Sequence, residues 1–142
     1  YGFLRDIAVS HELDLLIENV VCNTRDPMTR WAELREAYPD VHFIFDTKMA
    51  AFHNQLNALY TSGFDVCHYH VNDYAGGYMD WQNLRTLPIG RGNVNFDEFF
   101  AHIRRTGYDG TFTVEATAFD RQGVVDTTML NGCFDAIRTY LR

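Results

Sequence analysis

A chain of 142 residues with 46% hydrophobic and 22% charged residues has the balance of an ordinary folded domain, which excludes a disordered chain. The formal net charge of −7 argues against nucleic-acid binding, because contacts to a phosphate backbone need clustered Lys and Arg. No apolar run approaches the roughly 20 residues that span a bilayer, so we expect no membrane insertion.

The three cysteines are scattered along the chain, at Cys22, Cys67 and Cys133. A disulfide framework favours an even number of cysteines in a smaller chain, and a zinc knuckle favours close pairs. We therefore expect buried free thiols in a reducing cytoplasm. No signal peptide is visible, and because the chain begins at Tyr1 rather than Met we expect a trimmed or fragmentary chain.

Four short apolar runs alternate with amphipathic stretches. The runs, which we predict to be strands, are Leu13–Val20, Val41–Asp46, Asp65–Val71 and Thr111–Glu115. Because helices connect these strands, we expect parallel pairing in an α/β fold whose sheet is covered on both faces. The pattern fits either a small open sheet or part of a barrel, and periodicity alone does not choose between them.

Helices are predicted before, between and after these strands. Their ranges are 3–10, Pro27–Tyr38, Met49–Tyr60, Phe96–Thr106 and Val124–Leu141. Asp26 and Asn95 are the expected N-caps of two of them, and Glu98 follows Asn95 in capping-box spacing. The segment Asn72–Asn95 is predicted to be a long polar loop.

Each predicted strand finishes with a polar side chain, and the four are Glu18, Asp46, His70 and Glu115. Active sites in parallel α/β folds lie at the carboxyl ends of the strands. Three carboxylates and one imidazole converging there would be unfavourable unless a cation compensated them. Such a donor set suits Mn²⁺ or Mg²⁺ and would also accept Co²⁺ or Zn²⁺. For any one residue a helix cap or turn is an equal alternative, most plainly for Asp46 before Thr47.

Five stretches carry a resemblance to a known family: Leu16–Asn19, Phe45–Thr47, His70–Asp73, Pro88–Phe96 and Gly107–Glu115. In order and spacing they resemble the signatures of strands five to eight in the xylose isomerase-like barrel superfamily. The resemblance implies that residues 1–142 form a single domain, the C-terminal (βα)4 half of a TIM (β/α)8 barrel. A complete barrel of this type needs about 250 residues.

The resemblance also implies a function. The family's metal ligands fall on the four strand-end residues, and in its epimerases the glutamates that match Glu18 and Glu115 act as acid and base. This implies a sugar or sugar-phosphate isomerase or epimerase that works through a metal-stabilised enediolate. Met49 stands where many members have a histidine, and Gly76 where many ketose epimerases have an arginine. These departures disfavour free-sugar epimerases of the tagatose type.

Further residues are candidates for supporting roles. Lys48 and Arg91 are expected to bind an anionic group of the substrate, such as phosphate. Asp73 is expected to orient His70 or meet a substrate hydroxyl, with a turn-forming role as an equal alternative. His68 shares its strand with His70, and we assign it the role of a hydrogen-bonded interior histidine.

Two other functions remain open on the sequence. One is a metal-dependent phosphodiesterase of the endonuclease IV type, against which the acidic charge counts, as does the absence of extra histidines at Leu84–Thr86. The other is a catalytically inactive half-barrel that serves as a binding module. Because a half-barrel exposes two strand edges, we expect a homodimer or a missing N-terminal half as its partner.

Overall fold

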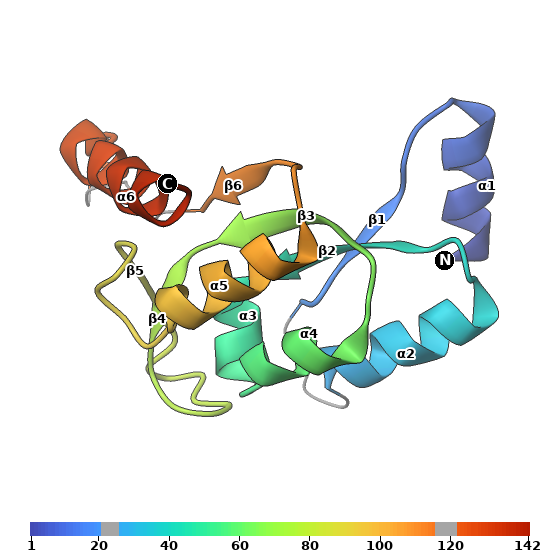
Figure 1. The fold of residues 1–142 in the computed structure, drawn as a ribbon, viewed down its shortest axis with the longest axis horizontal. Helices are drawn as coiled ribbons and strands as arrows, with labels where there is room; N and C mark the ends of the chain where they lie inside the picture. Colours follow the sequence, from blue (N-terminus) through green and yellow to red (C-terminus); the bar gives the residue numbers. More distant parts are fainter. Residues whose placement is uncertain (21–25, 116–121) are drawn as a thin grey trace.

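The computed structural model describes residues 1–20, 26–115 and 122–142 and has the predicted α/β architecture (Figure 1). Strands and helices alternate along most of the chain. In order they are α1 (Gly2–Ser10), β1 (Leu16–Glu18), α2 (Pro27–Ala37), β2 (His42–Asp46), α3 (Thr47–Phe52), α4 (Leu56–Ser62), β3 (Val66–Val71), β4 (Asp73–Ala75), β5 (Arg85–Leu87), α5 (Phe96–Thr106), β6 (Phe112–Val114) and α6 (Thr127–Tyr140).

The central sheet has four parallel strands in the order β1-β2-β3-β6. Its register aligns Asp46 with His70 and His70 with Thr113. Because the strands are parallel, their carboxyl ends meet at one edge of the sheet, and the predicted site residues of neighbouring strands come together there. The prediction of a parallel α/β sheet is confirmed.

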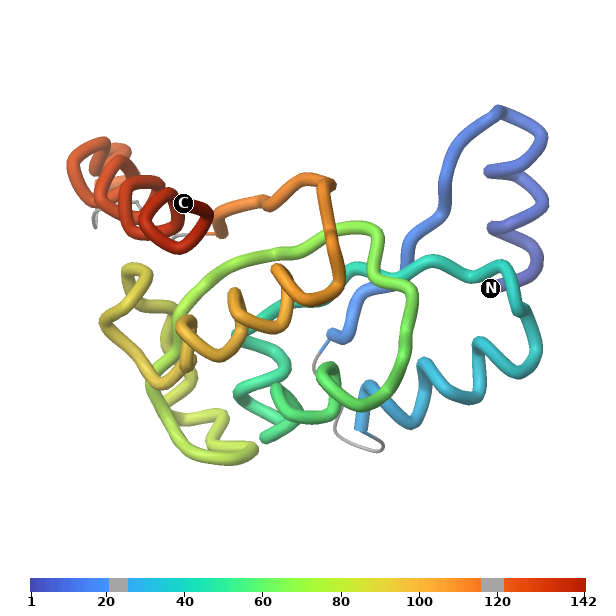
Figure 2. The backbone as a smooth tube through the Cα atoms, in the orientation of Figure 1, coloured from blue at the N-terminus to red at the C-terminus, as the bar shows by residue number. Residues whose placement is uncertain are grey.

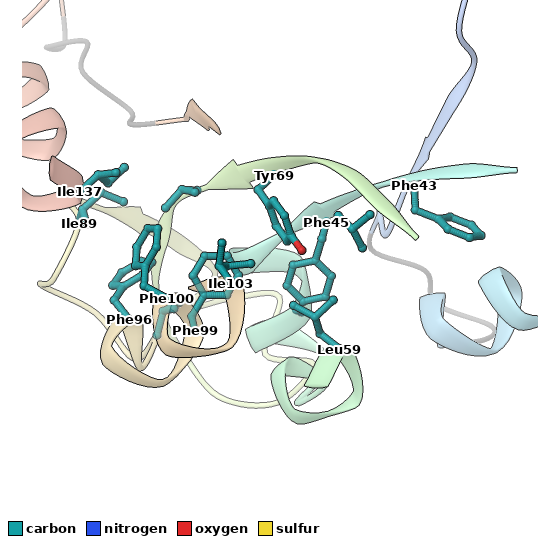
Figure 3. Close-up of a cluster of buried hydrophobic side chains, with 14 of the residues drawn as sticks. Phe43, Phe45, Leu59, Tyr69, Ile89, Phe96, Phe99, Phe100, Ile103 and Ile137 are labelled. Carbon is teal, nitrogen blue, oxygen red and sulfur yellow. The ribbon is translucent and has the colours of Figure 1, made fainter. Parts of the chain in front are cut away.

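One face of the sheet is covered by helices α2 to α5, and the hydrophobic core lies between them (Figure 1). Phe45 and Tyr69 of the strands meet Phe99 and Ile103 of α5 in this layer (Figure 3). Burying each of these large side chains contributes about 1.5–3 kcal/mol. Trp31 of α2 extends the core by stacking on Phe43, with 4.3 Å between ring centroids. This packing fixes the strands whose ends carry the site.

The other face of the sheet is lined by polar and apolar side chains around a cavity of about 440 Å³. Its lining residues are Asp14, Leu16, His42, Ile44, Cys67 and His68. Strands β1 and β6 form the two edges of the sheet. The two chain termini lie toward opposite ends of the molecule, beside α1 and α6 (Figure 2).

The single helix predicted for Met49–Tyr60 is wrong, because two short helices, α3 and α4, occupy this segment. The chain leaves the first helix at Asn54, whose φ of 55° is left-handed and ends the regular hydrogen bonding. Asparagine tolerates this conformation better than most residues. The first helix also begins earlier than predicted, at Thr47, because the Asp46 carboxylate caps it.

The loop predicted for Asn72–Asn95 contains a two-stranded antiparallel hairpin, β4 and β5. Asp73 organises it from inside, since its carboxylate accepts hydrogen bonds from the backbone N–H groups of Tyr74, Gly92 and Val94. A Cβ at Gly92 would collide with this carboxylate, so glycine permits the close approach. The hairpin is stabilised by residues distant in sequence, which the local pattern does not reveal.

Other boundaries shift modestly. The first strand is limited to Leu16–Glu18, and the last helix begins at Thr127, where the Asp126 side chain caps it.

Cys133 is buried, as predicted, but Cys67 is exposed, which contradicts the prediction for that thiol; Cys22 lies outside the described residues. No helix within the described ranges is both long and apolar enough to cross a membrane.

Candidate metal centre

Asp46 stands at the junction between β2 and α3 and is fully buried. Its Oδ1 accepts the backbone N–H of Met49 at 2.6 Å, which is the helix-capping role that the sequence offered as an alternative. Its Oδ2 accepts a hydrogen bond from Asn72 Nδ2 at 2.9 Å. Capping therefore occupies one oxygen and leaves the other directed toward the strand ends.

Asn19 fixes the backbone of Asp46 from the neighbouring strand. Its Oδ1 accepts the N–H of Asp46 at 2.6 Å, and its Nδ2 donates to the carbonyl of Asp46 at 3.1 Å. Asn19 follows directly after β1 and is 1% exposed. The amide thus continues the pairing of β1 with β2 beyond the last paired residue and holds Asp46 beside the end of β1.

His70 lies between the two glutamates. Its Nδ1 is 2.9 Å from Glu18 Oε1 and 3.1 Å from Glu115 Oε1. A single ring nitrogen carries at most one proton, so two carboxylate oxygens around it form a pattern that a shared cation would satisfy better. Glu18 comes from β1 and Glu115 directly follows β6, so the outer strands of the sheet supply the two carboxylates.

Three ligand atoms, one each from Glu18, Asp46 and His70, lie within 4.8 Å of one another. Glu115 joins this group through His70 and through Asn72, whose Nδ2 donates to Glu115 Oε2 at 3.1 Å. The side chains of Glu18 and Glu115 are 28% and 40% exposed, whereas Asp46 is fully buried. The structure therefore gathers the four predicted ligands around one small region, with the two glutamates facing solvent.

The electrostatics of the site favour a cation. The pKa of Asp46 is raised from 3.8 to about 6, chiefly by burial and to a smaller extent by the negative charge of Glu18. Hydrogen bonds from Met49 and Asn72, together with the positive charge of Lys48, act in the opposite direction without cancelling the burial effect. A divalent ion would supply the positive charge that this carboxylate lacks.

Asn72 is a site residue that the sequence analysis did not single out. It is fully buried, and besides Asp46 and Glu115 it contacts Lys48, whose backbone N–H donates to Asn72 Oδ1 at 2.8 Å. The hydroxyl of Thr47 also donates to the Asn72 carbonyl at 2.6 Å. Its position two residues after the predicted ligand His70 was the available signal, but an asparagine at a strand end is commonly a turn residue.

The remaining predicted residues differ in their surroundings. Lys48 Nζ donates to Thr86 Oγ1 of the hairpin at 3.2 Å, and Arg91 is exposed in the turn after β5. Asp73 is fully buried with three backbone N–H partners, which favours the turn-forming alternative. His68 is hydrogen-bonded as expected, with its ring nitrogens 2.9 and 2.8 Å from the hydroxyls of Thr111 and Thr113.

The fold and the arrangement of strand-end residues agree with a direct family match. The chain belongs to the xylose isomerase-like TIM barrel family, whose model matches residues 2–129. No curated protein matches the sequence. The superfamily predicted from the five sequence stretches is therefore confirmed.

Several solved structures share the fold. One is a D-tagatose 3-epimerase-like protein, which is 22% identical with a TM-score of 0.63. The match covers 99% of this chain and 54% of that chain. The IOLI protein, whose structure has a zinc atom, is 15% identical with a TM-score of 0.71 and coverages of 96% and 52%. A D-allulose 3-epimerase from Methylomonas sp. is 19% identical with a TM-score of 0.64 and the same coverages, 96% and 52%. This chain thus spans about half the length of the barrels it matches.

Proposed function

We propose that this chain is the C-terminal half of a divalent-metal-dependent isomerase or epimerase that acts on a sugar or a sugar phosphate. The observation that carries the proposal is the position of Glu18 and Glu115 on the same nitrogen of His70, at 2.9 and 3.1 Å, beside the buried Asp46. The family match, and the epimerases among proteins of the same fold, support this reaction class.

Glu18, Asp46, His70 and Glu115 would hold the metal ion. The donor set fits a divalent cation, because three carboxylates and an imidazole gather where the positive charge of Lys48 does not cancel the effect of burial on Asp46. Oxygen-rich donors favour Mn²⁺ or Mg²⁺, and Co²⁺ or Zn²⁺ would also be accepted. A bound ion would polarise the carbonyl and a neighbouring hydroxyl of the substrate, stabilising the negative charge that develops on their oxygens.

The two glutamates are the proposed acid and base. They come from the outer strands of the sheet and are the more exposed carboxylates of the site, so they are able to reach a substrate from two sides. One removes the proton from the carbon next to the carbonyl. The other returns a proton, to the opposite face in an epimerase or to the adjacent carbon in an isomerase.

Lys48 and Arg91 are the proposed contacts for an anionic group of the substrate. Of the two, Lys48 is better placed to bind an anion beside the metal centre. Its positive charge acts on Asp46, and its Nζ donates a hydrogen bond to the Thr86 hydroxyl at 3.2 Å. Arg91 is exposed and would contribute a second positive charge. The small-molecule substrate and the free thiols fit a protein that works in the cytoplasm.

The open sheet edges at β1 and β6 lead us to propose that a partner completes the barrel, either a second copy of this chain or an N-terminal half. Sedimentation equilibrium of the 142-residue chain distinguishes these. If the chain self-associates, its apparent mass should rise with concentration to that of a dimer. A monomer at all concentrations that also unfolds cooperatively contradicts the dimer and leaves the N-terminal half as the partner.

Hydrogen exchange at the substrate carbon tests the chemistry most directly. The chain is incubated with Mn²⁺ and a panel of ketoses and ketose phosphates in D₂O, and deuterium at the carbons next to the carbonyl is followed by NMR. We expect exchange that Glu18→Gln and Glu115→Gln each reduce by at least about 100-fold, as loss of a general acid or base does. Glu36→Gln, at an exposed position of α2, is the matched control. Equal exchange in all three variants would exclude the assignment of the two glutamates.

A further inference from the structure

We propose a second metal site, built from His42, Asp65 and Cys67, that selects a thiophilic divalent ion such as Zn²⁺. These residues lie at the amino ends of β2 and β3, whereas the first site lies at the carboxyl ends of the same strands. Asp46 lies four positions after His42 along β2, which corresponds to about 13 Å along the strand. The second site is therefore separate from the proposed catalytic site and does not depend on the proposed function.

The donor atoms converge as a metal site requires. His42 Nδ1 is 3.3 Å from Cys67 Sγ and 3.5 Å from Asp65 Oδ2, and all three donors lie within 4.8 Å of one another. Tetrahedral zinc, with bonds of about 2.0–2.3 Å, places neighbouring donors about 3.3–3.6 Å apart. The two shortest separations match this value, so an ion would need only small side-chain movements.

A backbone irregularity places the thiol beside the imidazole. The register between β2 and β3 pairs Phe43 with Val66 but the next residue, Ile44, with His68, so Cys67 is an additional residue in β3. An additional residue of this kind re-aims a side chain and is frequent near functional sites. Here it leaves Val66 in the core and lets Cys67 line the cavity with His42. Tyr69 and Val71 face the core, so strict alternation back along β3 would place Cys67 in the core and Val66 on the cavity face, the reverse of what is observed.

The same contacts disagree with a nucleophilic thiol activated by histidine. In a catalytic triad the nucleophile and the orienting carboxylate bind opposite nitrogens of the ring, whereas Cys67 and Asp65 both approach Nδ1 of His42. Burial and the negative charges of Asp65 and Asp14 also raise the pKa of the Cys67 thiol, the reverse of what an activated nucleophile needs. A metal ion, by contrast, would be stabilised by these negative charges.

The site is accessible and balanced in charge. The side chains of His42 and Asp65 are 45% and 77% exposed, and the cavity beside them holds about 440 Å³. One thiolate, one carboxylate and a neutral imidazole compensate a divalent ion. Asp14 lines the same cavity, and its negative charge would attract the ion without binding it. The three ligands leave the fourth position of a tetrahedral ion open for water.

Co²⁺ titration is the test, because the bond from a thiolate to Co²⁺ gives a near-ultraviolet charge-transfer band that carboxylate and imidazole ligands do not. The reduced 142-residue chain carrying Cys22→Ser and Cys133→Ala retains Cys67 as its one thiol. With excess Mg²⁺ present to occupy the first site, we expect a band that saturates at about one Co²⁺ per chain. Cys67→Ser abolishes the band, and His42→Ala weakens Co²⁺ affinity at this site by more than about tenfold.

Two controls separate this site from the first. Glu18→Gln lies in the first site and is expected to leave the charge-transfer titration unchanged while weakening Mn²⁺ binding. Cys67→Ser is expected to leave Mn²⁺ affinity and the circular dichroism spectrum unchanged, which shows that the variant folds. The absence of a saturable band in the single-thiol chain, or a His42→Ala titration identical to that of its parent, would overturn the second site.

Discussion

Asn72 donates a hydrogen bond from Nδ2 to Asp46 Oδ2 at 2.9 Å. The same nitrogen donates to Glu115 Oε2 at 3.1 Å, so one buried amide joins two of the four proposed ligands. Asp46 ends β2 and Glu115 follows β6, so the two carboxylates come from strands that are not neighbours, because β3 lies between them. The spacing of the site therefore depends on a residue that is not itself a proposed ligand.

Replacing this amide tests the dependence. Asn72→Ala removes both donated hydrogen bonds and the acceptor for the Lys48 N–H. We expect Mn²⁺ affinity to fall about 10–100-fold, as when a ligand loses its supporting hydrogen bond. The free energy of unfolding should fall by about 1–3 kcal/mol, because buried groups lose their partners. Calorimetric titration and urea unfolding measure the two effects. Asn57→Ala, at an exposed position of α4, serves as the control, and an unchanged affinity in Asn72→Ala would refute the role.

The pKa of Asp46, raised from 3.8 to about 6, predicts how stability depends on pH in the metal-free protein. Between these two values the folded state holds the proton more tightly than the unfolded state, so stability is lost as pH rises through about 6. A shift of this size corresponds to about 3 kcal/mol. About 1.4 kcal/mol of this is lost between about pH 5 and about pH 7.5, and urea unfolding with a chelator at these two pH values measures it.

Asp46→Asn is the control for this pH dependence. Asparagine retains the helix-capping ability at the start of α3 but does not ionise. The fall in stability between the two pH values should be smaller in this variant by the contribution of the carboxylate. If the wild type and Asp46→Asn lose the same stability over this range, the raised pKa is contradicted.

Trp31 lies in the hydrophobic core, where it is 1% exposed, and its Nε1 has no hydrogen-bond partner among the described residues. Trp31→Ala should lower the free energy of unfolding by about 3–5 kcal/mol through the cavity it leaves against Phe43. Trp31→Phe should lose less than about 1.5 kcal/mol, because it keeps an aromatic ring and removes the unpaired N–H. Trp81→Ala, at a 47% exposed position, is the comparison for the loss of an indole outside the core. Thermal unfolding ranks the three variants, and a Trp31→Ala loss no larger than that of Trp81→Ala would be inconsistent with this packing.

Asp73 was predicted to orient His70 or meet a substrate hydroxyl, with a turn-forming role as an equal alternative, and its surroundings favour the structural role in the hairpin. Asp73→Asn replaces an acceptor oxygen by a donor against backbone N–H groups. We expect the free energy of unfolding to fall by about 1–3 kcal/mol while Mn²⁺ affinity stays within about twofold. An intact stability combined with a large loss of substrate affinity would instead support the substrate-binding role.

The sequence predicted those parts of the molecule that follow from local patterns. Each strand that carries a proposed ligand is an apolar run with a polar end, so the parallel fold and the proximity of Glu18, Asp46 and His70 were accessible from the sequence. The break at Asn54 depends on a single backbone conformation. The hairpin depends on Asp73 reaching Gly92 and Val94, about twenty residues away, and no periodicity encodes such contacts.

The positioning residues were the least predictable part of the site. Asn19 and Asn72 follow strands at places where asparagine usually forms turns, and only the tertiary structure shows that they bind Asp46 and Glu115. Cys67 is a similar case, since a register shift that alternation does not foresee turns it toward His42.

Mn²⁺ binding to the purified chain is the decisive test of the metal centre formed by Glu18, Asp46, His70 and Glu115, since this hard ion favours the oxygen-rich site over the proposed thiolate site. Equilibrium dialysis of the wild type, Glu18→Gln and His70→Ala gives the stoichiometry and the affinity of each. We expect about one Mn²⁺ per wild-type chain and at least about tenfold weaker binding in both variants. No binding to the folded wild type, or equal binding in all three proteins, would contradict it.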